Sequence, residues 1–372
     1  VLFRSPKAII LLANTLTVLG TGVHHVMAMG FSDGTTDWSV SNAPEDAVGT
    51  SQCIARHDTK ALIILDQAGT LQAAANVQNL AADSFDVNFT TVNLAYQVHF
   101  IALGGDDLTD VNVNNFVTNT VSGDQAITGV GFKPDCIVFL SQKSAQASPA
   151  NEAHTHPMLG IAAGTKDRVI AGISVDNQAT SICWSSPDIA SIQFLEHKSG
   201  AISIGGTGEL KTMDVDGFTI NWTNLPDKAY HVGFLALKGP QFHVSFLGES
   251  TPAATGNQSY TGAGFTPKGV LVWGRNNPVG GGGLGLHNSI AVGATDGTNE
   301  GYIAATDRDA VGTTEADQFS NTDKLYKNTA YGSYASPTEV TLVSLDSDGW
   351  TGNRTAVDAG AQNVFGWWAI GD

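Results

Sequence analysis

The sequence predicts an all-β fold, made of three tandem antiparallel β-sandwich repeats of about 130 residues each. Three observations predict it. The 372 residues include 42 glycines and only 14% charged residues, which is typical of short strands joined by many turns. Apolar and polar residues alternate in several short segments, and no helical periodicity continues for more than about three turns. Some of these segments also recur three times along the chain, in the same order.

The clearest recurring segment reads DVDGFTINWTNLPDKAYHVGFLALKG in its middle copy. A weaker copy, ADSFDVNFTTVNLAYQVHFIALGG, precedes it, and a third, SDGWTGNRTAVDAGAQNVFGWWAIGD, closes the chain. Internal repetition at such a period indicates a multiplied domain rather than a solenoid unit, so each copy is expected to have its own core. The three copies lie at 82–105, 214–239 and 347–372.

Each copy is interpreted as two strands joined by a short polar connection. In the middle copy Phe218, Ile220 and Trp222 alternate with polar residues, which predicts a strand with one buried face. Asp216–Gly217 is the turn that opens it. The apolar residues of 230–237 alternate again and predict a partner strand. The segment is therefore predicted to be a β-hairpin that is used three times.

Two further landmarks fix the repeat boundaries. A buried strand follows a proline in each copy, at Pro6, Pro134 and Pro267. An apolar segment running into a Gly-containing turn also recurs, as MAMGFSDG, GIAAGTKD and IAVGATDG. The repeats are predicted to span 1–108, 109–240 and 241–372, and to be arranged with pseudo-threefold symmetry.

The start of the chain needs a separate interpretation. The apolar run at 8–20 could be read as the core of a signal peptide, but its recurrence at 135–141 and 268–274 indicates a buried strand. Residues 1–5, VLFRS, can be translated from the end of a common sequencing-library adapter, so we interpret them as an assembly artefact. We expect the natural chain to extend further, and repeat one to lack the leading strands that repeats two and three carry.

Charge and cysteine content exclude several classes of function. The net charge of −17 would repel a phosphate backbone, so nucleic-acid binding is not expected. Three cysteines are too few and too scattered for a disulfide scaffold or a Cys-x-x-Cys metal site. The predominantly apolar segment at 8–20 is 13 residues long, too short to cross a membrane. No cofactor is expected.

The residues that could carry chemistry all have a structural interpretation. Two histidine pairs lack a third ligand at a supporting spacing, the Asp-x-Asp-Gly pairs lack the completing calcium ligands, and the glycines at 280–283 lack the setting of a P-loop. No Ser, His and Asp set follows from spacing, so no catalytic, metal or ligand-binding residue is predicted. The pairs are His24–His25, His154–His156, Asp214–Asp216 and Asp346–Asp348.

The tandem pattern T-G-x-G-F-x-P, then D-G-F-T-x-N-W-T, then A-L-G-G-x-D-L-T resembles tandem-repeat virion proteins of bacteriophages and marine viral metagenomes. The middle repeat matches best, and the resemblance covers most of the chain. It implies a capsid-surface, decoration or tail-fibre protein without a catalytic motif.

The closing strands are also similar to those of H-type lectin domains, which are six-stranded antiparallel sandwiches that trimerise and bind sugars. Trp367-Trp368-Ala369-Ile370-Gly371 fits the ending of that pattern. Arg354 and Phe89 depart from it, because they stand where the middle repeat has Trp222.

The predicted function is that of a non-enzymatic structural protein of a virus particle, located on the virion or outside the cell. Its expected partners are other copies of itself and other virion proteins. Contacts between copies are expected at the long loops 141–157 and 274–288 and at exposed strand edges. The alternatives are a lectin-like protein that binds a host-surface glycan and a subunit of an extracellular filament.

Overall fold

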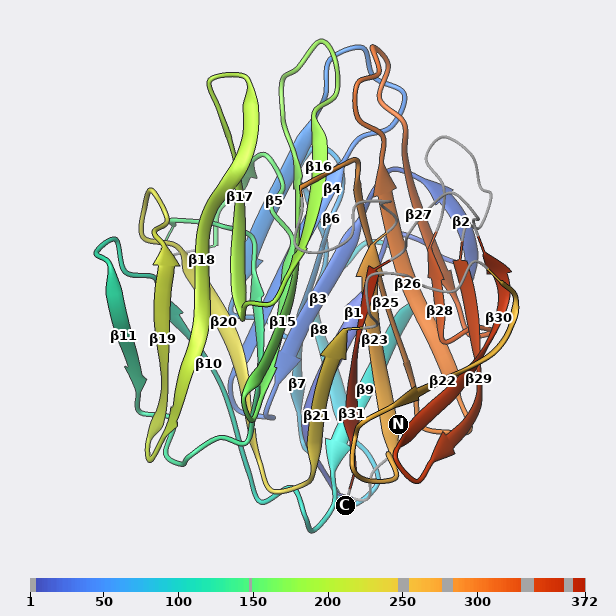
Figure 1. The fold of residues 1–372 in the computed structure, drawn as a ribbon. Helices are drawn as coiled ribbons and strands as arrows, with labels where there is room; N and C mark the ends of the chain where they lie inside the picture. The colour runs from blue at the N-terminus through green and yellow to red at the C-terminus, as the bar shows by residue number, and fades with distance from the viewer. Residues whose placement is uncertain are drawn as a thin grey trace.

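The computed structural model describes residues 5–146, 149–246, 254–275, 284–328, 338–357 and 364–371. In these ranges the protein is all-β, with six antiparallel sheets and no helix, as the sequence predicts (Figure 1). It follows that the described part of the chain has no helix that could span a membrane. The glycines at 280–283 lie outside the described residues.

Three large sheets form the centre of the molecule. The first has the order β13 (Glu152–Ala153), β5 (Cys53–Asp58), β4 (Asp37–Pro44), β3 (Met27–Ser32), β1 (Pro6–Ala13), β9 (Val98–Gly104). The second has the order β10 (Asp110–Val117), β20 (His231–Lys238), β12 (Cys136–Ser141), β14 (Met158–Ala163), β15 (Lys166–Ser174), β16 (Cys183–Asp188), β24 (Gly285–Leu286). The third has the order β2 (Gly20–Val23), β27 (Ala316–Asn321), β26 (Glu300–Asp307), β25 (Asn288–Thr295), β23 (Gly269–Arg275), β31 (Val364–Ile370), β21 (Phe242–Phe246).

Three smaller sheets complete the fold. The first consists of β6 (Leu62–Leu65), β7 (Leu71–Gln78) and β8 (Asp86–Val92). The second has the order β11 (Gly123–Thr128), β19 (Gly217–Asn224), β18 (Ala201–Asp214), β17 (Ile192–Lys198). The third has the order β22 (Gly256–Thr261), β30 (Gly349–Val357), β29 (Thr338–Asp346), β28 (Tyr326–Asn328).

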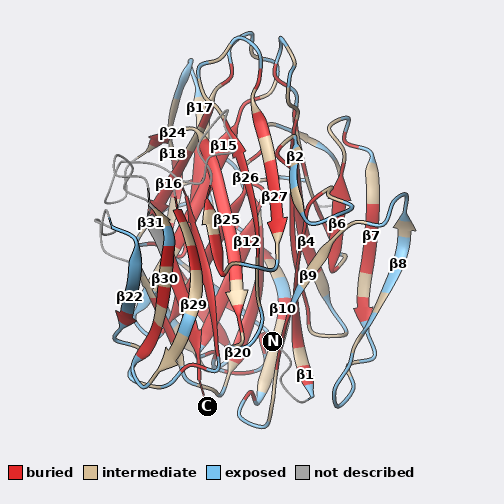
Figure 2. Cartoon of the chain, turned by 90° about the vertical axis from the view of Figure 1, so that its right-hand side faces the viewer, coloured by how far each residue is buried: buried red, intermediate tan, exposed pale blue. Residues whose placement is uncertain are grey.

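Four apolar clusters hold the sheets together. Three of them each lie between one large sheet and one small sheet, because the strands of both sheets turn their apolar residues inward. The fourth is shared by all three large sheets and fills the centre of the molecule. Figure 2 shows this buried interior, with exposed residues concentrated on outlying strands such as β8 and β22. The central cluster includes Ile10, Val138, Leu140, Leu271 and Trp273.

A glycine at the same place in each large sheet lets the small sheet come close. A Cβ atom on Gly160 would overlap the carbonyl oxygen of Ser191, at the start of the adjacent small sheet. Gly30 and Gly293 lie in the same way against Ala61 and Leu325. Any larger side chain at these positions would force the two layers apart.

The strand of 218–223 is buried on the predicted face. Phe218 and Ile220 have no exposed surface, and Trp222 is 3% exposed. The apolar residues of 232–236 are buried as well. The alternation of apolar and polar residues was therefore a correct guide to burial.

The predicted hairpin is wrong. β19 pairs with β11 and β18 in a small sheet, whereas β20 pairs with β10 and β12 in a large sheet. The polar connection between the two strands crosses from one layer to the other. The strands meet through side chains and not through backbone hydrogen bonds, with the rings of Phe218 and Phe234 5.2 Å apart, edge to face. β8–β9 and β30–β31 are divided between two sheets in the same way.

Each large sheet also receives one short strand from a distant part of the chain. β13 pairs with β5, β24 pairs with β16, and β2 pairs with β27. Two of these strands belong to the loops 141–157 and 274–288, whose predicted role is contact between copies. In their described parts these loops pair within the chain, and contact between copies stays a prediction.

Candidate functional site

Three histidines directly follow the short strands β2, β13 and β24, and each has a left-handed backbone. The φ angles are 71° at His24, 69° at His154 and 74° at His287, a conformation in which few residues other than glycine occur. In each case the ring Nδ1 atom accepts the backbone N–H of an aspartate. Because Nδ1 accepts, the neutral ring carries its proton on Nε2. The distances are 3.0 Å for His24 and Asp46, 2.8 Å for His154 and Asp176, and 2.9 Å for His287 and Asp309.

The same aspartates join neighbouring sheets. Each Oδ1 atom accepts a backbone N–H from a strand of another large sheet, namely β27, β16 or β5, which lies second from the edge. The first sheet is thereby bonded to the third, the third to the second and the second to the first. The pairs are Asp46 with Ala316, Asp309 with Cys183 and Asp176 with Cys53, each at 2.8 Å.

A hydroxyl group completes each junction. The Ser51 hydroxyl donates to the carbonyl of Val175 at 2.7 Å and accepts the N–H of Gln178 at 2.9 Å. The Ser181 hydroxyl likewise donates to the carbonyl of Arg308 and accepts the N–H of Val311. The Thr314 hydroxyl accepts the N–H of Val48. We call each set of histidine, aspartate and hydroxyl residue a clasp. The three clasps are His24, Asp46 and Thr314; His154, Asp176 and Ser51; and His287, Asp309 and Ser181. The loops that carry the clasps meet at the upper end of the molecule in Figure 1.

Electrostatics favour a structural role for the clasps. Burial, reinforced by the positive charge of Arg308, lowers the pKa of His287 to about 4, and burial also lowers the pKa of His154. Both rings are therefore neutral near pH 7 and can accept a hydrogen bond. Burial and the nearby Asp307 raise the thiol pKa values of Cys53 and Cys183 well above the ordinary value, so neither thiol is activated as a nucleophile.

Below the clasps lies a buried polar cluster. The Ser174 hydroxyl donates to Asp307 Oδ2, and Asn288 Nδ2 donates to Ser174 Oγ at 2.9 Å. His25 Nδ1 lies 3.1 Å from Asp307 Oδ2, but without the geometry of a hydrogen bond. All four residues are at most 3% exposed. They come from all three large sheets or the loops beside them, so the cluster adds a polar layer to the central packing.

The sequence-predicted candidates are distributed as follows. The rings of His154 and His156 are perpendicular, with centroids 6.3 Å apart, and His154 Nδ1 is already bonded to Asp176. Asp216 accepts the N–H groups of Gly129 and Gly131, at 3.1 and 2.6 Å. Asp348 likewise accepts the N–H of Gly264 at 2.6 Å. Within the described ranges, no group of three or more His, Cys, Asp or Glu residues could hold a metal ion.

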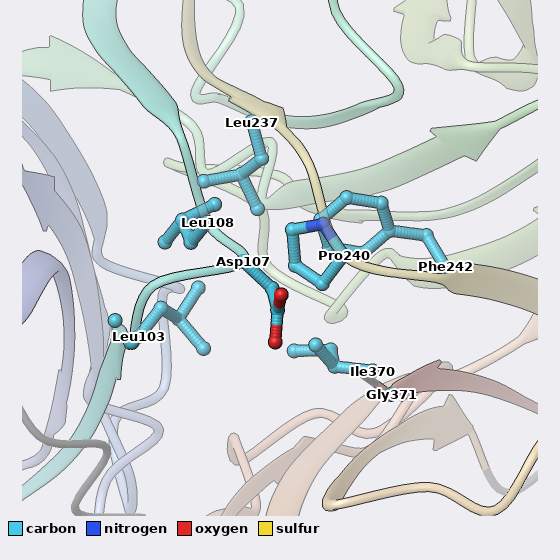
Figure 3. Close-up of a pocket in the computed structure, with 10 residues that line it drawn as sticks. Leu103, Asp107, Leu108, Leu237, Pro240, Phe242, Ile370 and Gly371 are labelled. Carbon is cyan, nitrogen blue, oxygen red and sulfur yellow. The ribbon is translucent and has the colours of Figure 1, made fainter.

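Two hollows lie where the large sheets meet. The first is a cavity of about 50 Å³, which is too small for a sugar (Figure 3). It is surrounded by Leu103 of β9, Leu237 of β20 and Ile370 of β31. The second is a groove of about 400 Å³ between β9 and the turn that joins β25 to β26. Its lining includes His99, Phe100, Asp296, Glu300 and Tyr302. Its size is within the range of ligand sites.

Sequence reasoning missed the clasps. The available signal was a histidine that recurs just before the second landmark, in VHHVM, HTHPM and LHNSI. Two of these histidines, His24 and His154, belong to the pairs that lack a third metal ligand, and the third copy has only one histidine.

Comparison of the chain with protein-family models, curated proteins and solved structures finds no match.

Proposed function

We propose that the chain is built of three tandem antiparallel β-sandwich repeats with pseudo-threefold symmetry, and that it is a non-enzymatic structural protein of a virus particle. The observation that carries the proposal is the closed ring of three clasps. Each repeat donates an aspartate to the next and receives one from the previous, as subunits of a cyclic trimer do. The domains proposed are 1–108, 109–240 and 241–372.

Several contacts recur at corresponding places and support the repeat arrangement. The glycine that admits the small sheet occurs three times, at Gly30, Gly160 and Gly293. Asp33 and Asp296 hold the same turn, each accepting two backbone N–H groups through Oδ1. The three large sheets follow one strand order, apart from strands at their edges.

The chemistry of the buried polar groups supports a structural role. The clasp histidines hold the aspartates, and the aspartates accept backbone N–H groups of neighbouring large sheets, which fixes the positions of these sheets relative to one another. Such a body presents loops and strand edges on a rigid scaffold. Placement on a virus particle rests on the resemblance to phage repeat proteins.

A lectin-like role is the second candidate, and the groove beside β9 favours it. Carboxylates of Asp296 and Glu300 lie there with the aromatic rings of Phe100 and Tyr302. Carboxylates and aromatic faces are suitable partners for a glycan. The Trp222 position does not contribute, because that ring is buried and its Nε1 donates to Gln125 at 2.9 Å.

Sedimentation velocity over a wide concentration range, followed by electron microscopy, tests the proposal. We expect concentration-dependent assembly into defined oligomers or lattices, with interfaces above about 1,000 Å². Long unbranched fibres would instead support the extracellular filament. A protein that stays monomeric and binds one glycan on an array would overturn the structural role in favour of the lectin.

A further inference from the structure

Most histidines of the chain lie where two large sheets meet. Three belong to the clasps, whose aspartates bond neighbouring sheets. The others at these junctions contact or lie near a residue of a neighbouring sheet. Histidine is the side chain whose ordinary pKa lies closest to neutral pH, so the junctions collect groups that acid can charge. Eight of the ten histidines lie there, namely His24, His25, His57, His99, His154, His231, His243 and His287.

The junction of the first and second large sheets contains a stack of three rings. Trp38 of β4 and His57 of β5 come from the first sheet, and His231 of β20 comes from the second. The ring centroids of Trp38 and His57 are 4.9 Å apart, and those of His57 and His231 are 5.3 Å apart with the planes 24° from parallel. Gly233 makes room for the stack, because a Cβ atom there would overlap the Trp38 ring. Two imidazoles from different sheets therefore lie face to face, with His57 only 3% exposed.

The groups around this stack compensate a positive charge poorly. In β5, Arg56 Nη2 lies 2.7 Å from Asp58 Oδ2, so the carboxylate next to His57 already has a cationic partner. His231 Nδ1 lies 3.3 Å from Oδ1 of Asn115 in β10, an uncharged group. Burial lowers the pKa of His57 to about 4, reinforced by a charge on His231 and only partly opposed by Asp58, and burial lowers the pKa of His231 as well. Both rings are therefore neutral near pH 7, and protonating both would place like charges 5.3 Å apart.

The junction of the second and third large sheets has a different histidine. His243 of β21 is 8% exposed, and its ring centroid lies 4.6 Å from that of Trp367. Burial lowers the pKa of His243 to about 4, and the positive charges of Lys166 and Arg168, in β15 of the second sheet, lower it further. Asp348 acts in the opposite direction with a smaller effect than Lys166. A proton on His243 would therefore add a charge to a junction where the neighbouring sheet already carries two of the same sign.

The junction of the third and first large sheets holds His99 of β9. Its Nε2 atom lies 2.7 Å from the hydroxyl oxygen of Ser320 in β27. Gly301 of β26 leaves room for the ring, because a Cβ atom there would lie 3.1 Å from His99 Nδ1. Burial lowers the pKa of His99, and a hydroxyl group compensates a positive charge less than a carboxylate does. Each junction therefore holds at least one histidine that is neutral while the sheets stay together.

We propose that the junctions between the large sheets form an acid-sensitive release, in which protonated histidines part the sheets and uncover the central apolar cluster. The stack of Trp38, His57 and His231 opens first, because two like charges meet there in the interior. A histidine whose pKa is lower in the closed state than in the open state takes up a proton on opening, so acid favours the open state. The closed state is fully stable above about pH 6.5, the ordinary pKa, and loses stability as the pH falls toward 4.

Hydrogen exchange of the whole protein, measured by mass spectrometry from about pH 7 to about pH 4 and corrected for the intrinsic exchange rate, tests the proposal. Protection in β5 and β20 should fall first, by up to about tenfold per pH unit for each ring that gains a proton on opening. Protection in β19, inside a small sheet, should persist, and the loss should reverse at neutral pH. Unchanged protection of β5 and β20 down to pH 4, or a simultaneous loss in β19, would overturn the proposal.

Two phenylalanine variants locate the response and serve as controls for each other. His57→Phe keeps a flat ring on Trp38 but cannot take up a proton, so near pH 5 it should restore protection of β5 and β20 about tenfold over the wild type. It should leave the acid response of β21 unchanged. His243→Phe should do the reverse, restoring β21 while β5 and β20 respond as in the wild type. Equal effects of the two variants on both junctions would show that acid unfolds the protein as a whole, which contradicts a release at separate junctions.

A second variant of the stack guards against poor folding of the first. His231→Gln also removes a proton site, and glutamine is a residue that the fold accepts at this place. Ile101 and Leu235 occupy matching positions in β9 and β20, so Gln97 is the counterpart of His231. Protection equal to the wild type at pH 7 shows that a variant is folded. Both stack variants should then lose less protection in acid, and a wild-type acid response in both would overturn the role of the stack.

Discussion

Replacing Asp176 by alanine tests whether the clasps hold neighbouring sheets together. The Asp176 carboxylate accepts the N–H of Cys53 at 2.8 Å, and Cys53 is buried. Alanine removes the acceptor and leaves a buried amide without it. Such a loss costs about 1–3 kcal/mol of unfolding free energy. The hydrogen bond from the backbone of residue 176 to His154 is retained, so the cost belongs to the side chain.

Urea unfolding followed by tryptophan fluorescence measures this cost, because Trp273, Trp350, Trp367 and Trp368 are fully buried. Asp176→Asn is the control: its amide oxygen can still accept, so it should cost less than about 1 kcal/mol. Asp46→Ala and Asp309→Ala should cost about as much as Asp176→Ala, since their bonds have the same length. Costs below about 0.5 kcal/mol in all three alanine variants would refute the reasoning.

Three further predictions concern stability. Trp222→Ala should cost about 3–5 kcal/mol in the same assay, because it empties a core position; a cost under about 1 kcal/mol would contradict the burial of that face. Gly160→Ala should cost about 1–3 kcal/mol because its methyl group would overlap the carbonyl of Ser191, whereas alanine at the exposed Gly49 should be nearly neutral. Since burial lowers the pKa of His287 to about 4, below its ordinary value of 6.5, the unfolded chain binds more protons between these values. Stability should therefore be full above about pH 6.5 and fall toward pH 4, and His287→Asn, which tolerates the left-handed backbone, should flatten that fall.

The sequence allowed the fold class and the buried faces to be predicted, because a period of two reports which side of a strand meets apolar surroundings. It did not show which strands pair. Each strand buries one apolar face whether the two strands share a sheet or lie in opposite layers, so the alternation fits both arrangements. The hairpin prediction failed for this reason.

The clasps could not be derived from local patterns either. His154 acquires its role from a left-handed backbone and from Asp176, and the bond from Asp176 to Cys53 crosses between sheets that are far apart in sequence. Comparing the three copies position by position, and not searching for metal ligands, would have singled out His287 together with the other two histidines.

The short strands that pair with a distant part of the chain, β2, β13 and β24, have a consequence for biosynthesis. β2 pairs with β27, and a bond of the same junction, from Gln318 to Val23, joins residues 295 positions apart. On the ribosome β2 therefore waits for most of the chain before its partner emerges. Long-range strand pairing of this kind slows folding and leaves apolar edges open to chaperones or to aggregation. Once the last junction has formed, no sheet can detach without breaking its links to the other two, so unfolding is expected to be slow and the native protein to be kinetically durable.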